Sequence, residues 1–277
     1  MSDLVTLREV MAIAEKDNVA IPAFNIDTIE ITQAVLEECE KENHPVIVAV
    51  GQAAIRDGKL EMLSDVVHRY IKHMHVPVVL HLDHGQNFTQ VMQALKCGYS
   101  SVMIDGSKYS LAENIAMTKE TIDAAYAVGA SVEAELGAIL GTEDDITNHT
   151  TEDYLVKVED VKTFISQVHP DALAIGIGNK HGFYQGRPHL DFQRLQEVKD
   201  ICDIPLVLHG GSGIPEDMLR EAIKIGIRKI NVATEIRFAY STGMVKGAAN
   251  NDYYEMVKVA KQSVHDMVAS KTKIFFA

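Results

Sequence analysis

The sequence predicts an α/β protein of the (β/α)8, or TIM, barrel type, folded as a single domain over residues 1–277. Two observations carry this prediction: eight short apolar runs recur along the chain, and longer amphipathic segments alternate with them. Nearly all the short runs are apolar throughout, as expected of strands buried on both faces. A doubly wound open sheet is the competing arrangement, but eight strands with one helix per crossover favour closure into a barrel.

The expected elements follow one another without a linker. Strands are expected over residues 20–25, 46–50, 78–83, 101–105, 131–135, 172–176, 205–209 and 229–232. Helices are expected over residues 29–42, 60–73, 89–96, 111–128, 151–168, 192–198 and 215–225, and a C-terminal helical extension over about 234–277. One long polar interruption, residues 137–150, follows the fifth strand, on the face where barrel enzymes keep mobile loops.

Composition excludes several classes of protein. A formal net charge of −13 argues against nucleic acid as a partner, because phosphate backbones require basic patches. Three separated cysteines, Cys39, Cys97 and Cys202, indicate a reducing compartment rather than a disulfide frame. The N-terminus lacks the pattern of a signal peptide, and no apolar run approaches the roughly 20 residues of a membrane helix. We therefore expect a cytoplasmic protein with neither a nucleic-acid nor a membrane partner.

Polar residues collect where the expected strands end. His84, His181 and His209 follow or end three different strands. One histidine at a strand end is more often structural, but three at one mouth match the open three-histidine site of catalytic zinc. His81 shares a strand face with Asp83, and we expect it to be packed or to support the site. The remaining polar residues at this mouth are Asn25, Asp83, Asp105, Glu135 and Asn231.

Two loops near the end of the chain indicate a phosphate site. In "HGGSGIP", the glycines are expected to leave backbone N–H groups open to an anion, and Ser212 adds a hydroxyl. In "NVATE", Thr234 is expected at a helix N-cap. A plain tight turn and simple helix capping are the alternatives. Both loops nevertheless fall after strands seven and eight, where barrels commonly bind phosphate, so a phosphorylated ligand is predicted.

Five motifs together resemble the class II, metal-dependent ketose-bisphosphate aldolases: "HLDHG", "VEAELG", "GNKHGFY", "LHGGSG" and "KINVATE". The likeness is nearer to the tagatose-bisphosphate branch, because Ala233 stands where many fructose-bisphosphate enzymes carry Asp. It implies one catalytic Zn²⁺ on His84, His181 and His209, with Asp83 as the acid/base at the C4 hydroxyl. Glu143 would transfer the proton at C3, Asn231 would contact the carbonyl or enediolate, and Asp105 and Glu135 match a second or transient metal position.

The same resemblance supplies the other partners. A small phosphorylated sugar would be bound by Asn25, Gly182, Gly210, Gly211, Ser212, Asn231, Ala233 and Thr234, with Na⁺ or K⁺ near the phosphate. Family members assemble as homodimers or homotetramers, and either state is expected here. The reaction implied is reversible cleavage of a ketose 1-phosphate to dihydroxyacetone phosphate and an aldehyde.

The departures from the family pattern lie at the aldehyde end. Gly51 and Gln52 stand where family members commonly carry a phosphate-binding Ser, and "NNDYYE" replaces an Asp-Pro-Arg segment. A tagatose or fructose 1,6-bisphosphate-like substrate is expected. The alternative is a ketose 1-phosphate with another anionic C6 group, such as 6-deoxy-6-sulfofructose 1-phosphate, which would give sulfolactaldehyde. Lys271 and Lys273 are candidates for the missing cation, against the alternative of a solvated tail.

Three other functions remain open at this point. A Schiff-base aldolase would use Lys229, and a barrel metal hydrolase would use His and Asp ligands to activate water. A non-catalytic assembly or regulatory subunit would use the fold alone.

Overall fold

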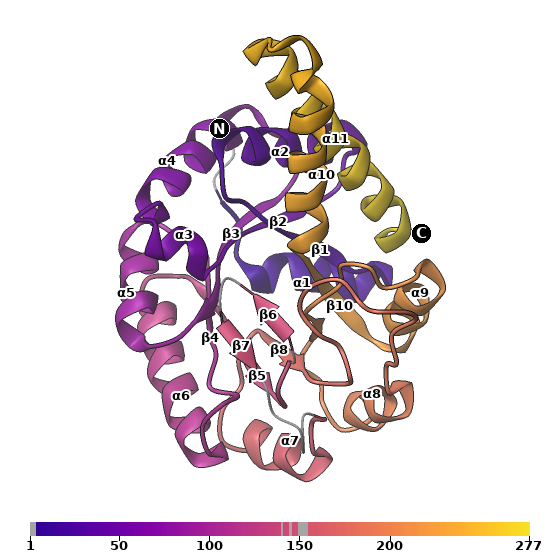
Figure 1. The fold of residues 1–277 in the computed structure, drawn as a ribbon. Coiled ribbons are helices and arrows are strands. Elements are labelled where there is room, and N and C mark those ends of the chain that lie inside the picture. The colour runs from indigo at the N-terminus through magenta and orange to yellow at the C-terminus, as the bar shows by residue number, and fades with distance from the viewer. Residues whose placement is uncertain (1–3, 140, 144–145, 149–154) are drawn as a thin grey trace.

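Eight parallel strands close into a barrel, as Figure 1 shows in ribbon form. The computed structural model describes residues 4–139, 141–143, 146–148 and 155–277. Around the barrel the strands follow the order β1-β10-β9-β8-β5-β4-β3-β2. They are β1 (Ile21–Asn25), β2 (Val46–Val50), β3 (Val78–Gly85), β4 (Ser101–Ile104), β5 (Ser131–Leu136), β8 (Ala172–Ile175), β9 (Leu206–Leu208) and β10 (Ile227–Val232). The prediction of a closed (β/α)8 barrel is confirmed.

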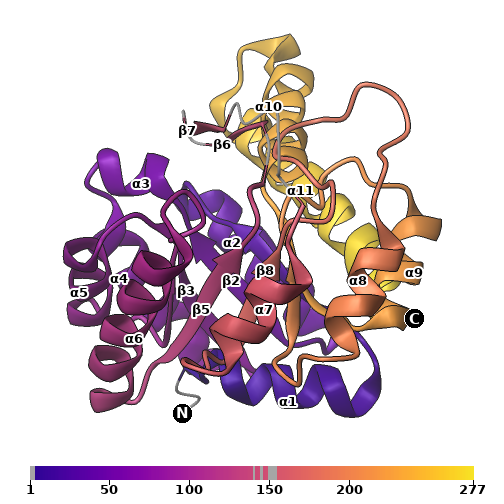
Figure 2. The ribbon, with the colours of Figure 1, turned by 90° about the horizontal axis from the view of Figure 1, so that it is seen from below.

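The helices surround this barrel (Figure 2). Those that alternate with the strands are α2 (Ile29–Glu42), α4 (Leu60–Tyr70) with the short η1 (Ile71–His73), α5 (Phe88–Lys96), α6 (Leu111–Ala127), α7 (Val158–Ile165), α8 (Phe192–Lys199) and α9 (Glu216–Ile225). The helix expected over 151–168 begins later, at Val158, while residues 151–154 lie outside the described part. Most other boundaries agree with the predicted ones within a few residues.

A helix that the strand and helix pattern did not reveal, α1 (Leu7–Asp17), closes the floor of the barrel. Thr6 and Glu9 form a capping box at its start, the pairing that "TLRE" encodes. Leu7, Val10 and Met11 lie in one buried cluster with inward-facing residues at the entrances of several strands. The N-terminal end of the barrel is therefore an apolar plug.

Two further elements follow strands β2 and β5. The five-residue α3 (Gln52–Arg56) comes directly after β2. Within the polar interruption, β6 (Gly141–Glu143) pairs antiparallel with β7 (Ile146–Asn148). A side chain at Gly141 would lie 2.5 Å from the carbonyl oxygen of His181. The hairpin therefore begins directly against the loop that carries one of the predicted zinc ligands.

The C-terminal extension is a helical hairpin rather than one continuous region. Helix α10 (Thr234–Gly247) continues into η2 (Ala248–Asn250), and α11 (Tyr253–Phe275) returns beside it (Figure 1). Asn251 adopts a left-handed φ of 51°, and Asp252 caps α11. Gly243 lets the two helices touch, since a Cβ there would lie 2.5 Å from the Cα of Ala260.

The barrel interior changes character from floor to mouth. Small and branched apolar side chains fill the floor next to α1. Above them lie buried polar residues, among them His81, Glu133 and Lys229. Side chains alternate along a strand, so His81 and Asp83 both point inward, as do Glu133 and Glu135. This polar upper half forms the candidate site.

Candidate active site

Three imidazoles, those of His84, His181 and His209, meet at the barrel mouth; we call them the histidine cluster. Nδ1 of His209 lies 2.8 Å from Nε2 of His84. The rings of His84 and His181 are 5.1 Å apart between centroids, and one ligand nitrogen from each of the three lies within 4.8 Å of the others. Imidazole nitrogens gathered this closely are the donor set that zinc binds. The structure thus brings together the three residues that the sequence singled out.

His84 is held in an unusual backbone conformation. Its φ is 49°, in the left-handed region that a residue with a side chain seldom occupies. The pairing of β3 with β4 shifts between Leu82 and Gly85, so His84 lies on a bulge. Gly85 itself has no positive φ; instead, a side chain there would strike the carbonyl oxygen of Met103. The bulge aims the imidazole of His84 at the other two rings.

A buried ion pair supports His209 from below. Nε2 of His209 lies 2.8 Å from Oε1 of Glu133, and Nζ of Lys229 lies 2.8 Å from Oε2 of the same carboxylate. All three side chains are fully buried. A carboxylate at Nε2 assigns the ring proton to that nitrogen, so the lone pair of Nδ1 faces the cluster. Lys229 is sealed in this pair, which argues against the Schiff-base alternative.

His81 lies in the same buried layer as this ion pair. Its Nδ1 is 2.8 Å from the hydroxyl of Ser101, and its Nε2 is 3.7 Å from Glu133. Burial and the nearby Lys229 ammonium lower the pKa of His81 well below its ordinary value. It is therefore a neutral, packed residue beneath the cluster, in the supporting position that the sequence suggested.

The protonation of the cluster follows from its neighbours. Burial lowers the pKa of His84, but the carboxylates of Asp83, Asp105 and Glu135 outweigh it and raise that pKa well above its ordinary value. His209 shifts the other way, because burial and the adjacent His84 lower its pKa well below the ordinary value. These opposite shifts favour a proton on His84 that is donated to a neutral His209 whenever no metal ion is bound.

Asp105 and Glu135, which we call the acidic pair, face the far side of His84. Oδ2 of Asp105 lies 3.1 Å and Oε2 of Glu135 lies 3.8 Å from Nδ1 of His84. Burial and the neighbouring Asp105 raise the pKa of Glu135 well above its ordinary value. Burial also favours the protonated form of Asp105, but hydrogen bonds from His84 and Ser107 overcome it and lower that pKa. Together with His84, the acidic pair forms a second group that could hold a cation.

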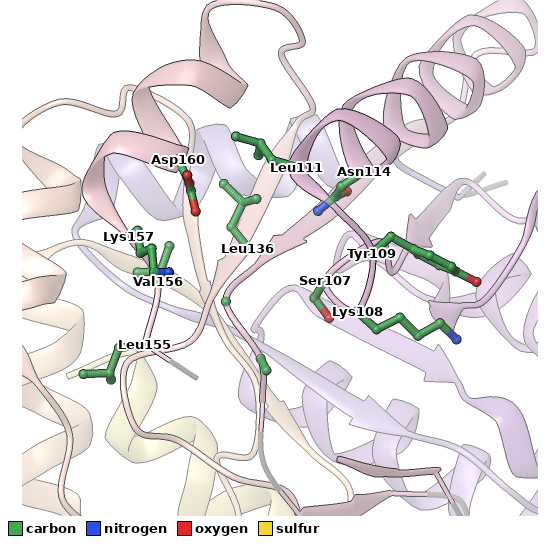
Figure 3. A pocket seen from close by; sticks show the side chains of 12 residues that line it. Ser107, Lys108, Tyr109, Leu111, Asn114, Leu136, Leu155, Val156, Lys157 and Asp160 are labelled. Atoms are coloured by element: carbon green, nitrogen blue, oxygen red, sulfur yellow. The ribbon is translucent and has the colours of Figure 1, made fainter. Parts of the chain in front are cut away.

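A hollow of about 270 Å³ is lined by residues that contact the acidic pair, Ser107 and Asn114 among them (Figure 3). Ser107, which hydrogen-bonds Asp105, lines it, as does Asn114, which donates to the carbonyl of Glu135 over 2.8 Å. Residues 137–138, at the start of the polar interruption, and residues 155–157, just ahead of α7, complete its wall. Its charged residues are Lys108, Lys157 and Asp160, so the lining selects no single sign of charge.

Two amides hold the carboxylate of Asp83. Nδ2 of Asn25 donates to its Oδ2 over 2.9 Å, and Nδ2 of Asn231 donates to its Oδ1 over 3.0 Å. The same Asn231 nitrogen is 3.4 Å from Nδ1 of His209, which places Asp83 beside the cluster. The Oδ1 atoms of both asparagines accept no hydrogen bond from any residue that the structure describes. The site thus offers an oriented carboxylate and two buried acceptor oxygens.

The loop of residues 210–213, which we call the glycine loop, is folded differently from the expectation. The N–H of Gly211 donates to the carbonyl of Asn231 over 2.9 Å, and the N–H of Gly213 donates to Oε1 of Glu235 over 2.8 Å. The prediction that these two N–H groups stay open for an anion is therefore wrong. At Gly211 a Cβ would lie 2.8 Å from Asn231 O, and Gly210 adopts a φ of 65° against the carbonyl of Lys180. These two glycines serve close packing against neighbouring backbone.

The start of α10 also differs in one detail. The helix begins at Thr234, with Ala233 at the N-cap, so the prediction of Thr234 as the N-cap residue is wrong. Ser212 of the glycine loop takes over that role, because its Oγ accepts the N–H of Glu235 over 3.2 Å. Ser212, Ala233 and Thr234 thus gather at the N-terminus of a 14-residue helix, where N–H groups and the helix dipole favour an anion.

The loop carrying His181 is tied to the glycine loop. The hydroxyl of Tyr184 accepts the N–H of Lys180 over 2.9 Å and donates to the carbonyl of Gly210 over 3.1 Å. Asn179 adds a second tie, since its Nδ2 donates to the carbonyl of His209 over 3.0 Å. Gly182 adopts a φ of 86°, which lets the chain turn directly after His181. Two of the three cluster histidines are thereby positioned against one another.

The candidates for the aldehyde end lie elsewhere than expected or are already engaged. Gly51 is the N-cap of α3, and Nε2 of Gln52 donates to the carbonyl of His84 over 2.8 Å. Lys271 forms an ion pair with Glu235, next to the glycine loop. Lys273 is exposed near the end of α11. That end of the helix lies at the start of β1, because the carbonyl of Phe275 accepts the N–H of Ala20, so Lys273 is not placed to contact substrate at the barrel mouth. Glu143 ends β6, and its side chain lies outside the described part.

Four contributors were missed by the motif reasoning: Glu133, Asn179, Tyr184 and Glu235. Glu133 had a readable signal, because it precedes Glu135 by two residues and must share its strand face. Tyr184 and Glu235 act through contacts between distant loops, which local spacing does not reveal.

Comparison with known proteins places this arrangement in a wider group. The family model described as "Fructose-bisphosphate aldolase class-II" matches residues 5–277. The chain is similar to the YdjI aldolase from Escherichia coli K12, with 28% identity, a TM-score of 0.87, and coverage of 99% of this chain and 97% of that one. It is also similar to a protein from Coccidioides immitis assigned as a fructose-1,6-biphosphate aldolase, with 26% identity, a TM-score of 0.90, and coverage of 97% and 95%.

A third structure supports the fold. The fructose-bisphosphate aldolase from Campylobacter jejuni has a TM-score of 0.80 over 99% of this chain and 96% of that one, at 22% identity. Within the described residues, we find no helix whose length and apolar character would let it span a bilayer.

Proposed function

The chain belongs to the class II fructose-bisphosphate aldolase family, and from that membership we propose that it cleaves a ketose 1-phosphate into dihydroxyacetone phosphate and an aldehyde, using one zinc ion held by the histidine cluster. The observation that carries the proposal is the placement of the oriented Asp83 carboxylate directly beside that cluster. Aldol cleavage needs an electrophile at the substrate carbonyl and a base at the hydroxyl two carbons away. The site offers groups for both tasks at one mouth.

The residues present fit a zinc ion. Nδ1 of His84 contacts Asp105, and Nε2 of His209 contacts Glu133. The remaining nitrogens, Nε2 of His84 and Nδ1 of His209, face one another. Ligand histidines are commonly oriented in this way by carboxylates on their second nitrogen. When bound, zinc would supply electrophilic polarisation of the substrate carbonyl.

The protein's own groups would then move the protons. In the cleavage direction, Asp83 accepts the proton of the C4 hydroxyl as the C3–C4 bond breaks. C4 becomes the aldehyde carbon, and the electron pair of the broken bond remains on C3. A proton delivered to C3 completes dihydroxyacetone phosphate, and we propose Glu143 for that delivery, supported by the start of its hairpin against His181.

The phosphate group is proposed to lie at the N-terminus of α10. The hydroxyl of Ser212 can accept from Glu235 and still donate its own proton to a phosphate oxygen. Thr234 is half-buried at the first helical position, where backbone N–H groups have no partner within the helix. These donors suit a phosphate monoester. A metal hydrolase that only activates water at the histidine cluster gives no reason for such donors at this place.

The aldehyde end of the site, which would bind the group at C6 of the substrate, departs from the family pattern. The segment in place of Asp-Pro-Arg forms the turn into α11, with Asp252 occupied as a helix cap. Gln52 is engaged with the backbone of His84. We therefore propose that the preferred substrate is tagatose 1,6-bisphosphate or a ketose 1-phosphate with another anionic C6 group, rather than fructose 1,6-bisphosphate.

A matched substrate panel tests this function. We would measure kcat/KM of the zinc-loaded enzyme for fructose 1,6-bisphosphate, tagatose 1,6-bisphosphate, 6-deoxy-6-sulfofructose 1-phosphate and fructose 1-phosphate. Asp83→Asn serves as the control, because it preserves side-chain shape and should retain zinc while losing cleavage. Clear preference for fructose 1,6-bisphosphate would refute the C6 argument. Inactivity on every member despite bound zinc would favour a non-catalytic subunit.

A further inference from the structure

The C-terminal helix reaches the proposed phosphate site through one partly buried ion pair. Nζ of Lys271, on α11, lies 2.6 Å from Oε2 of Glu235, on the first turn of α10. The two side chains are 9% and 20% exposed, so little water separates them. An ion pair between elements that meet only in the folded chain orders both of them.

Glu235 is the link between this ion pair and the glycine loop. Its Oε1 accepts the N–H of Gly213 over 2.8 Å, and its backbone N–H donates to Oγ of Ser212 over 3.2 Å. The loop and the helix start therefore bind each other reciprocally. The backbone of Glu235 thus holds the Ser212 hydroxyl, while its side chain holds the next residue of the same loop.

The charge of Glu235 presents a problem that Lys271 solves. A carboxylate next to a phosphate site repels a dianionic ligand, and the repulsion is strong where water is scarce. With the Lys271 ammonium on its second oxygen, Glu235 can bind Gly213 without presenting a net charge to the ligand. The lysine does not need to touch the substrate to do this.

We propose that Lys271 and Glu235 form a positioning pair that orders the glycine loop and neutralises the carboxylate beside the phosphate, so that Lys271 determines affinity for the phosphate monoester. This inference rests on the proposed phosphate site of the aldolase. It assigns Lys271 to the phosphate end of the substrate, in place of the aldehyde end considered from the sequence.

Phosphate binding tests the pair without turnover. Calorimetric titration of the zinc-loaded protein with inorganic phosphate should show about tenfold weaker binding for Lys271→Met than for wild type. Lys271→Arg should bind within about twofold of wild type because it keeps the positive charge. Lys273→Met, two residues further along α11 and exposed, is the matched control and should bind like wild type.

The double variant separates charge from scaffolding. In Glu235→Gln/Lys271→Met the repelling charge is gone, so phosphate affinity should return to within about threefold of wild type. Phosphate affinity in the double variant as weak as in Lys271→Met would overturn the electrostatic role. If Lys271→Met does not fold, Glu235→Gln decides alone: phosphate binding equal to or tighter than wild type supports the proposal, and tenfold weaker binding refutes it.

Kinetics distinguish this inference from the function on which it rests. If the protein is the proposed aldolase, Lys271→Met should raise KM for its ketose 1-phosphate about tenfold while kcat changes less than about threefold. If the enzyme is active and Lys271→Met changes neither KM nor phosphate affinity, the positioning pair is refuted and the aldolase proposal stands. If the protein cleaves no ketose phosphate but Lys271→Met still weakens phosphate binding, the positioning pair is supported and the aldolase proposal is refuted.

Discussion

Replacing Glu133 with glutamine removes one negative charge from the buried layer beneath the histidine cluster and changes the shape of the side chain very little. Two groups depend on that charge. Lys229 loses the negative charge that lies 2.8 Å from its ammonium, and His209 has at most a neutral amide oxygen where a carboxylate oxygen lies 2.8 Å from its Nε2. Both partners are fully buried, so water cannot replace what is lost.

The magnitudes follow from these contacts. Leaving one partner of a buried ion pair uncompensated typically costs about 3–5 kcal/mol of folding free energy. Losing the carboxylate that orients a ligand histidine typically costs about 10–100-fold in metal affinity. Glu133→Gln should therefore unfold at clearly lower urea concentration in the metal-free state and bind zinc at least about tenfold more weakly.

Two companion variants separate the effects. Lys229→Met leaves the contact between Glu133 and His209 in place, so it should lose stability with a smaller effect on zinc affinity. Glu133→Gln/Lys229→Met removes both charges, so it should regain much of the stability while zinc affinity stays low. The assays are urea unfolding of the metal-free protein and zinc titration against a competing chromophoric chelator. A Glu133→Gln protein with zinc affinity within twofold of wild type and unchanged stability would refute the reasoning.

Three further predictions concern the histidine cluster and the loops beside it. Burial lowers the pKa of His84, but the surrounding carboxylates raise it overall, so its folded value exceeds the unfolded value of about 6.5. The proton on His84 therefore stabilises the metal-free fold fully below pH 6.5, and this stabilisation is lost as pH rises through the raised pKa. Zinc must displace that proton, so affinity should rise with pH from 6 upward; calorimetry in buffers of different ionisation enthalpy should detect the released proton, and equal heats would contradict it. Tyr184→Phe removes both hydrogen bonds of its hydroxyl and should cost about 1–3 kcal/mol in urea unfolding, with no change expected only if the two loops are held independently. Gly211→Ala would place a methyl group 2.5 Å from Ile230 Cγ2 and 2.8 Å from Asn231 O, so inorganic phosphate should bind at least about tenfold more weakly; wild-type phosphate affinity would show that the loop can yield.

The parts of the fold that the sequence predicted well are those that depend on local pattern. Buried parallel strands are apolar on both faces, so their runs stand out, and all eight were located. Because strands of a barrel end at one mouth, residues at those ends could be gathered without knowing any distance. That reasoning brought His84, His181 and His209 together.

The parts that escaped depend on contacts between distant segments or on backbone detail. The left-handed φ of His84 arises from a bulge between β3 and β4, which no spacing encodes. The N–H groups of Gly211 and Gly213 donate to Asn231 of β10 and Glu235 of α10, two elements that follow the glycine loop in the chain. The helix α1 was within reach, since "TLRE" is a capping signature ahead of buried positions, but its role as the floor needed the closed barrel.

Zinc titration of the metal-stripped protein tests the central claim most directly. The claim is that three histidines hold one zinc ion next to Asp83 and that this arrangement performs aldol cleavage. Activity is measured as the release of dihydroxyacetone phosphate from the preferred ketose 1-phosphate. It should rise linearly with added zinc and level off at one equivalent per chain. Full cleavage activity in the stripped protein, unaffected by added zinc, would contradict it.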